Sequence, residues 1–366
     1  MASQWIYVIA GNGSFVSSFV HNKYLATTTE EEATMKTVTH ILSLVSALAL
    51  VAAFAMPGAA LAEKTRLGFG GGPEGGTFQY FSNGIASRLS KMLPDVEVSN
   101  MASAGSVENV RRTNSGEIDF GIGYSGDTYL ARNGRLTNDT TKYPNVMAMA
   151  FLYGAPAHLI VLEGGGINKV ADLKGKRVAV GGAGSGAAAA AQRYFVALGL
   201  WDKMNVEFIG YSKAAAAIGD GLIDAMWVFA GFPNSSVIQA AASNKIKLLD
   251  TWEAGEKGGA FQQYPFYAPL TIPAGTYSGV DYDVKSFQDS ALWIANKDVA
   301  LEHVYNALAN IYTKEGLSYM VKVKSTAKSM SVAGALTGIV TPVHPGAQKF
   351  WKEQGLTLTE AQMGGM

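Results

Sequence analysis

Two hydroxyl side chains follow glycine-rich turns at points where a strand is expected to lead into a helix. Ser185 lies between two glycines in VAVGGAGSGAAAAAQRYF (residues 178–195), and Thr77 follows a glycine pair in FGGGPEGGTF (residues 69–78). A turn of this kind presents free backbone N–H groups and the positive end of a helix dipole. The pattern favours binding of a small anion, either the phosphate of a nucleotide or another small acid.

The nucleotide and nucleophile alternatives each lack a residue that they require. The first turn fits G-x-G-x-x-G, but the next expected strand ends in Asn100 instead of an acidic residue for a ribose, and Glu74 would repel a pyrophosphate. A nucleophile elbow needs G-x-S-x-G, which neither Ser185 nor Ser125 satisfies. We therefore expect no catalytic residue and a binding protein instead of an enzyme.

The composition narrows the partners. The chain has 366 residues and a formal net charge of zero, so no basic face for nucleic acid is expected. It has no cysteine, and its five histidines show no metal-ligand spacing. We expect no cofactor and no metal, and a small-molecule ligand as the main partner.

The N-terminal region has the features of an export signal. The apolar run ILSLVSALALVAAF (residues 41–54) is followed by a small-x-small site that ends at Ala62. We expect residues 35–62 to be a signal peptide cleaved after Ala62, and residues 1–34 to be an untranslated or disordered extension. The mature chain would then be periplasmic. An uncleaved membrane anchor is the alternative, although a spanning helix needs about 20 apolar residues.

The positioning elements repeat along the chain. Each glycine turn is followed by a helix and later by a G-x-I-D sequence that opens a strand, first at residues 116–119 and again at residues 221–224. Strands that alternate with helices predict mostly parallel sheets covered on both faces. The chain is therefore expected to form an α/β protein with two lobes and a ligand cleft at the carboxyl ends of the strands.

The lobe boundaries follow from two expected crossing strands. One is the apolar run at residues 157–164, which contains His158, and the other is a return strand at residues 267–277. Lobe 1 would comprise residues 63–156 and 268–366, and lobe 2 would comprise residues 157–267 with hinge strands at both ends. We interpret His158 as a core histidine instead of a ligand.

Candidate ligand-binding residues lie at the expected starts of helices and ends of strands. Helix capping or core packing is the alternative for several of them. No arginine lies in these loops, which favours a small carboxylate or amino acid over phosphate. The candidates are Gly76, Thr77, Phe78, Ser106, Asn109, Tyr124, Ser125, Ser185, Gly186, Ala187, Gly231 and Pro233.

Four segments together resemble the TAXI family, the solute-binding proteins of one branch of the tripartite ATP-independent periplasmic (TRAP) transporters. They are GGTFQYFSNGIAS, GSVENVRRTNSGEIDFGI, VADLKGKRVAVGGAGSGA and GDGLIDAMWVFAGFP. The resemblance implies a type II periplasmic-binding-protein fold. It also implies capture of a dicarboxylate or amino acid such as 2-oxoglutarate or glutamate, and delivery to TRAP permease subunits driven by an ion gradient.

The resemblance also implies pocket positions at Thr77 and Phe78, Ser106 and Asn109, Ser185 and Gly186, and residues 231–233. The sequence departs from the family pattern at Phe78-Gln79 and at residues 124–127, and both departures touch the expected pocket. Two alternatives stay open: the binding component of an ABC-type uptake system of the same fold, and an exported α/β hydrolase or transferase.

Overall fold

The computed structural model describes residues 64–364, which belong to one compact unit of the chain. The predicted extension and signal peptide, residues 1–62, lie outside the described residues. Within residues 64–364, every helix is too short or too polar to span a bilayer.

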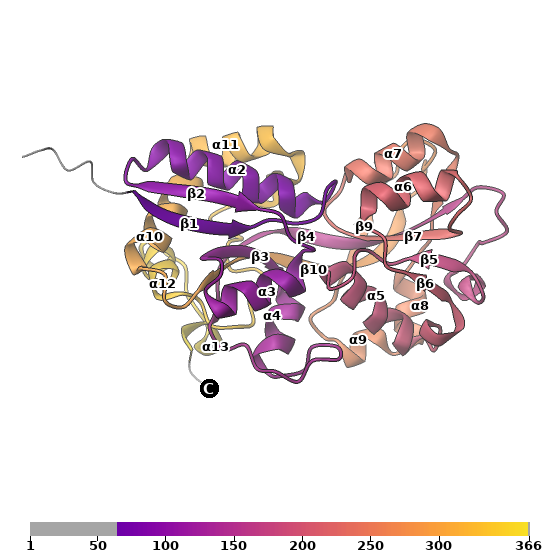
Figure 1. The fold of residues 1–366 in the computed structure, drawn as a ribbon, viewed down its shortest axis with the longest axis horizontal. Helices are drawn as coiled ribbons and strands as arrows, with labels where there is room; N and C mark the ends of the chain where they lie inside the picture. The colour runs from indigo at the N-terminus through magenta and orange to yellow at the C-terminus, as the bar shows by residue number, and fades with distance from the viewer. Residues whose placement is uncertain (1–63, 365–366) are drawn as a thin grey trace, which may run out of the picture. The chain divides into compact units, whose positions relative to one another are not determined.

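The described strands form one mixed sheet in the order β2-β1-β3-β10-β4-β7-β5-β6, with β8 paired to β4 and β9 paired to β10 (Figure 1). The strands are β1 (Thr65–Gly70), β2 (Val96–Met101), β3 (Phe120–Tyr124), β4 (Val146–Leu162), β5 (Arg177–Ala179), β6 (Asn205–Glu207), β7 (Ala225–Phe229), β8 (Ile246–Leu248), β9 (Ala268–Ile272) and β10 (Val284–Asn296).

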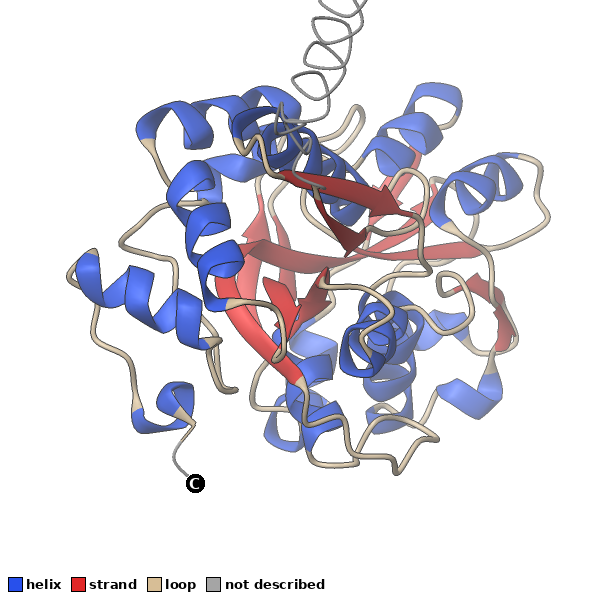
Figure 2. Cartoon of the chain, turned by 60° about the vertical axis from the view of Figure 1, so that its left-hand side comes forward, coloured by secondary structure: helices blue, strands red, loops and turns tan. Residues whose placement is uncertain are grey.

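Helices flank the strands (Figure 2). The α-helices are α2 (Thr77–Met92), α3 (Ser106–Ser115), α4 (Ser125–Arg132), α5 (Gly186–Ala197), α6 (Tyr211–Gly219), α7 (Ser235–Ser243), α8 (Trp252–Lys257), α9 (Ala260–Gln263), α10 (Leu301–Ile311), α11 (Lys314–Val323), α12 (Pro345–Glu353) and α13 (Glu360–Met363). Three 3-10 helices are η1 (Val170–Leu173), η2 (Trp201–Lys203) and η3 (Ser325–Ser329).

The sheet has two halves of parallel strands. In the first half β1 pairs in parallel with β2 and β3, and in the second half β5 pairs in parallel with β6 and β7. Two long strands, β4 and β10, run between the halves. Residues 157–161 of β4 pair with β7, and residues 291–295 of β10 pair with β3.

The crossing strands differ from the prediction in two ways. β4 is continuous, whereas the sequence predicts separate strands at 146–152 and 157–164. The glycine and proline of its middle, Gly154 and Pro156, lie opposite β10, whose pairing keeps the strand extended. The predicted return crossing at residues 267–277 is wrong, because β9 is a short strand paired only with β10, and β10 itself makes the crossing.

The two G-x-I-D sequences have the same structural role. The glycine of each, Gly116 and Gly221, has a positive φ, of 76° and 68°, which is the backbone conformation that ends a helix. The carboxylate of Asp119 accepts a hydrogen bond from the Gly68 N–H at 2.7 Å, and that of Asp224 accepts one from the Arg177 N–H at 2.7 Å. Each aspartate thus ties the start of its strand to the neighbouring strand.

Candidate ligand-binding site

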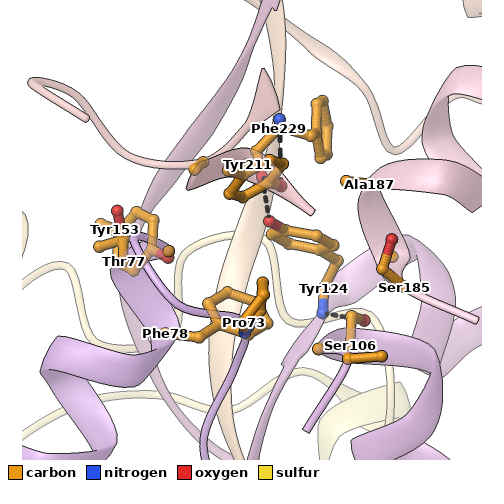
Figure 3. Close-up of a pocket in the computed structure, with 15 residues that line it drawn as sticks. Pro73, Thr77, Phe78, Ser106, Tyr124, Tyr153, Ser185, Ala187, Tyr211 and Phe229 are labelled. Atoms are coloured by element: carbon orange, nitrogen blue, oxygen red, sulfur yellow. Dashed lines mark hydrogen bonds between the residues drawn. The ribbon is translucent and has the colours of Figure 1, made fainter. Parts of the chain in front are cut away.

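A small cavity, here called the inner cavity, lies where helices of the two halves meet (Figure 3). The centre of a water-sized sphere can occupy about 20 Å³ of it, which is room for about one water molecule. An organic acid therefore needs the two halves to move apart before it can enter. This agrees with hinge closure around a ligand, the motion that the sequence predicts.

Four helices begin at the inner cavity, α2 and α3 from the first half and α5 and α6 from the second. The residues before three of them are Gly76, Gly105 and Gly210, which offer no side chain to cap the first N–H groups. These N–H groups and the helix dipoles give the cavity a positive potential. The residues that line it include no Lys, Arg, His, Asp or Glu.

Two of the hydroxyls in the lining already donate their protons to the protein. Thr77 Oγ1 donates to the Gly231 carbonyl at 3.2 Å. Ser106 Oγ donates to Asp127 Oδ2 at 2.6 Å and accepts from the Tyr124 N–H at 2.8 Å. Toward a ligand, both oxygens can therefore act only as acceptors.

Two buried tyrosines are committed in the same way. The hydroxyls of Tyr124 and Tyr211 donate to the carbonyl of Phe229, at 2.5 and 3.0 Å. Burial raises the pKa of Tyr124 well above its usual value, and the nearby Tyr211 adds to the shift. Burial also raises the pKa of Tyr211. Both side chains therefore keep their protons at neutral pH.

Ser185 and Tyr153 are lining residues whose hydroxyl protons have no partner among residues 64–364. Ser185 Oγ accepts from the Ala188 N–H at 3.0 Å, which caps α5, and this contact leaves the hydroxyl proton free to donate. Tyr153 lies beside Thr77 on the opposite side of the cavity (Figure 3), and burial raises its pKa well above its usual value. The cavity thus offers donors from the backbone, Ser185 and Tyr153, together with several acceptor oxygens.

A buried ion pair lies directly behind the lining. Arg193 Nη1 of α5 is 2.9 Å from Asp127 Oδ1 of α4, and both side chains are at most 2% exposed. Arg193 Nε also donates to the Tyr267 hydroxyl at 2.9 Å. A second carboxylate, Asp289, accepts from the Gly126 N–H, and burial and the charge of Asp127 raise its pKa. The pair joins the two halves and offsets the charge of Asp127 behind the cavity.

Gly186 marks the closest approach of α5 to the first half. A Cβ atom added to it would lie 2.5 Å from Ser106 Cβ, 2.7 Å from Asp127 Oδ2 and 2.8 Å from Tyr124 Cδ2. Such distances are shorter than any ordinary contact, so only glycine allows the halves to come this close.

A set of hydrogen bonds beside the cavity also joins the halves. The carbonyls of three successive residues, 231–233, accept from the side chains of Thr77 at 3.2 Å, Thr326 at 3.1 Å and Lys324 at 3.1 Å. We call residues 231–233 the clasp segment. It belongs to the second half, whereas α2, α11 and η3, which carry or adjoin the donors, pack together on the first half.

The structure brings most of the predicted residues to the cavity. Those that line it are Gly76, Thr77, Phe78, Ser106, Tyr124, Ser185, Gly186 and Ala187. Asn109, Ser125, Gly231 and Pro233 do not line it. Asn109 donates to three backbone carbonyls, at 2.7–3.2 Å, and Ser125 donates to the Gly338 carbonyl. Gly231 and Pro233 belong to the clasp segment.

The sequence analysis missed several lining residues, namely Pro73, Ala104, Gly105, Tyr153, Tyr211, Phe229 and Ala230. Tyr211 begins a helix directly after Gly210, which is the same signal that identified Thr77 and Gly186. The sequence analysis also did not predict Arg193, which lies behind the cavity, seven residues after Gly186 on the same helix face.

His158 is a core residue, as predicted. It is fully buried, its Nδ1 donates to the Pro156 carbonyl at 3.1 Å, and its Nε2 accepts from the Tyr277 hydroxyl at 2.9 Å. Burial lowers its pKa to about 4, so it is neutral at pH 7. Across residues 64–364, no cluster of three or more His, Cys, Asp or Glu side chains is placed to hold a metal ion.

The chain is similar to known proteins in sequence and in fold. A model of the NMT1-like family matches residues 69–355. One similar solved structure is the alkanesulfonate-binding protein SsuA of Xanthomonas axonopodis pv. citri bound to MOPS, with 16% identity over 80% of this chain and 92% of that chain and a TM-score of 0.45.

Two other similar structures are a putative L-cystine ABC transporter protein of Listeria monocytogenes and MatC of Rhodopseudomonas palustris with bound malate. The first has 16% identity over 70% of this chain and 94% of that chain, with a TM-score of 0.46. The second has 17% identity over 79% and 97%, with a TM-score of 0.48. The match to the family model covers well over half of the sequence. The chain therefore belongs to the NMT1-like family, and its described part has the α/β fold of the periplasmic solute-binding proteins, with two halves joined by crossing strands.

Proposed function

We propose that the chain is the extracytoplasmic solute-binding component of an uptake system. It captures a small organic acid or amino acid in the inner cavity and presents it, unchanged, to a membrane permease. The observation that carries the proposal is the convergence of four helix N-termini from both halves on one cavity whose lining has no Lys, Arg, His, Asp or Glu side chain. Such an arrangement holds an anion through N–H donors and dipoles.

The hydrogen-bond inventory restricts the ligand further. A carboxylate fits the free N–H groups and the proton of Ser185. The hydroxyls of Thr77 and Ser106 already donate hydrogen bonds to the protein, so their oxygens pair best with N–H or O–H groups of the ligand. An amino acid or hydroxy acid, including a glutamate-like one, satisfies both requirements better than a 2-oxoglutarate-like keto acid.

The membrane partner is the finer part of the proposal. An ABC-type transporter, the alternative of the sequence analysis, agrees better with the family match and with the solute-binding proteins named above than a TRAP permease does. Export to the periplasm and cleavage after Ala62 stay predictions from the sequence. Uptake into vesicles that contain the cognate permease tests the partner, because ABC transport requires internal ATP, whereas TRAP transport continues on an ion gradient alone.

A thermal-shift screen tests the ligand class. Amino acids, hydroxy acids, keto acids and dicarboxylic acids are added in turn at millimolar concentration. A ligand at 100 times its Kd stabilises the folded chain by about 2.7 kcal/mol, because it binds only that form. We expect at least one amino acid or hydroxy acid to raise the Tm. Absence of a shift with every acid, or release of product from model esters, would contradict the proposal.

A further inference from the structure

A second cavity, here called the outer cavity, lies beside the inner cavity between α3 and α5. On the same measure its volume is about 240 Å³. One wall is a single face of α5, formed by Ser185, Ala188, Ala189 and Gln192, whose spacing is helical. The opposite wall comes from the first half and includes Val107 of α3.

The contact between α3 and α5 separates the two cavities. Ser185 lines both of them. Ser106 and Val107 are successive residues, and the first lines the inner cavity while the second lines the outer one. The dividing contact is the close approach of Gly186 to Ser106. When the halves move apart, this contact opens and the two cavities become one continuous cleft that a ligand can enter. When the contact forms again, the ligand lies beside Ser185, which lines both cavities.

The floor of the outer cavity is apolar. Val107, Leu136 and Ala188 are at most 6% exposed, and the ring of Phe208 stands at the edge with 53% of its surface exposed. The small side chain of Ala189 leaves the space between them open. Burial of an apolar chain against such a floor is favourable by about 0.8 kcal/mol per CH₂.

The charge in the outer cavity is already neutralised. Arg111 is the charged residue of its lining, and its Nη2 is 2.6 Å from Asp139 Oδ2. Although burial alone would raise the pKa of Asp139, the Arg111 guanidinium and the Tyr143 hydroxyl hold it well below its usual range. The arginine is thus paired with Asp139, so a second carboxylate of a ligand would compete with Asp139 for this cation.

We propose that the ligand is an amphiphilic monocarboxylic acid whose carboxylate lies in the inner cavity and whose apolar chain lies in the outer cavity. This inference rests on the proposed function and names the ligand class of the same site. It distinguishes the chain from a receptor for dicarboxylates, because the four helix N-termini lie at the inner cavity, whereas the charged side chain that lines the outer cavity is paired with Asp139.

Isothermal titration calorimetry on the mature chain tests this inference. The probes are straight-chain acids of four, six and eight carbons that carry hydrogen, a hydroxyl or an amino group at carbon 2, each compared with the same acid bearing a second, terminal carboxylate. The variant Ala189→Phe fills the outer cavity. Val196→Phe places the same ring on the same helix at a site that is 49% exposed and outside both cavities.

For at least one head group, we expect the affinity of the monocarboxylates to rise about fourfold per added methylene, which corresponds to about 0.8 kcal/mol. The terminal carboxylate should abolish the gain. Ala189→Phe should remove the dependence on chain length, and Val196→Phe should retain it. If Ala189→Phe does not fold, Ala189→Leu serves as the smaller plug.

Affinity that is independent of chain length would overturn the inference, and so would a chain-length dependence that survives in a folded Ala189→Phe or Ala189→Leu variant. Preference for dicarboxylates would also overturn it while leaving the proposed function in place. Only a lack of binding by every acid would remove both.

Discussion

Replacement of Gly186 by alanine tests whether the closed contact of the two halves controls ligand affinity. Gly186 is not among the described glycines with a positive φ, so alanine can adopt its backbone conformation. The new methyl group would lie 2.5 Å from Ser106 Cβ, whereas carbon atoms in contact are normally about 3.5–4.0 Å apart. The halves must therefore separate by about 1.0–1.5 Å at this point, or the neighbouring atoms must shift by that distance.

Overpacking of this kind costs about 1–3 kcal/mol. The cost falls on the closed form alone, because an open form does not make the contact. We therefore expect Gly186→Ala to weaken binding of the best ligand about 5- to 150-fold, at about 1.4 kcal/mol per tenfold, with little change in the free energy of unfolding of the free protein. Isothermal titration calorimetry measures the first quantity and urea unfolding the second.

Gly182→Ala is the matched control, since it adds the same methyl group to the same loop. A Cβ atom at Gly182 meets nothing within 4 Å. This variant should bind like the wild type. Equal affinities of Gly186→Ala and the wild type, or equal losses in the two variants, would refute the reasoning that the contact between Gly186 and Ser106 limits closure.

Three further predictions concern buried groups. Arg193→Leu leaves the charge of Asp127 unpaired and should lower the free energy of unfolding by about 3–5 kcal/mol. Adding Asp127→Asn should restore most of the lost stability, as measured by urea unfolding. A double variant as unstable as Arg193→Leu would contradict this prediction. Because His158 has a pKa of about 4 in the folded chain, against 6.5 as its ordinary value, the unfolded chain binds more protons between these pH values. Its contribution to stability, about 3 kcal/mol, is therefore present above pH 6.5 and lost as the pH falls toward 4; a comparison of urea unfolding at pH 7 and pH 5 should show a smaller loss in His158→Gln than in the wild type, and equal losses would count against it. Ser185→Ala should lower the free energy of unfolding by about 0.5–2 kcal/mol because the cap of α5 is lost, whereas Ser185→Gly should lower it by only a few tenths. Both variants should weaken ligand binding by the same factor. Binding losses that follow the stability losses would assign Ser185 to capping alone.

Local sequence signals predicted the parallel parts of the sheet and most of the cavity. Glycine turns into helices placed Thr77 and Gly186 correctly, because the N–H groups of a helix start point outward wherever the helix packs. The G-x-I-D repeats predicted two similar halves, because each glycine ends a helix and each aspartate directly precedes a strand.

Long-range pairing set the features that local signals did not predict. Gly154 and Pro156 favour a break between two strands, yet β4 continues through them because it pairs with β10 on one side and with β7 further along. Tyr153 reaches the cavity from the middle of that strand. Arg193 and Asp127 are 66 positions apart in the sequence, and only the approach of the two halves shows that they are partners.

The clasp segment has a consequence for how affinity can evolve. Its three carbonyls accept hydrogen bonds from the opposite half, and two of the donors, Thr326 and Lys324, do not line the inner cavity. These bonds therefore bias the equilibrium between open and closed forms before a ligand is bound. Observed affinity is the intrinsic affinity scaled by the fraction of molecules in the competent form. Substitutions at Thr326 or Lys324 can therefore tune the concentration at which the protein saturates without altering what it recognises.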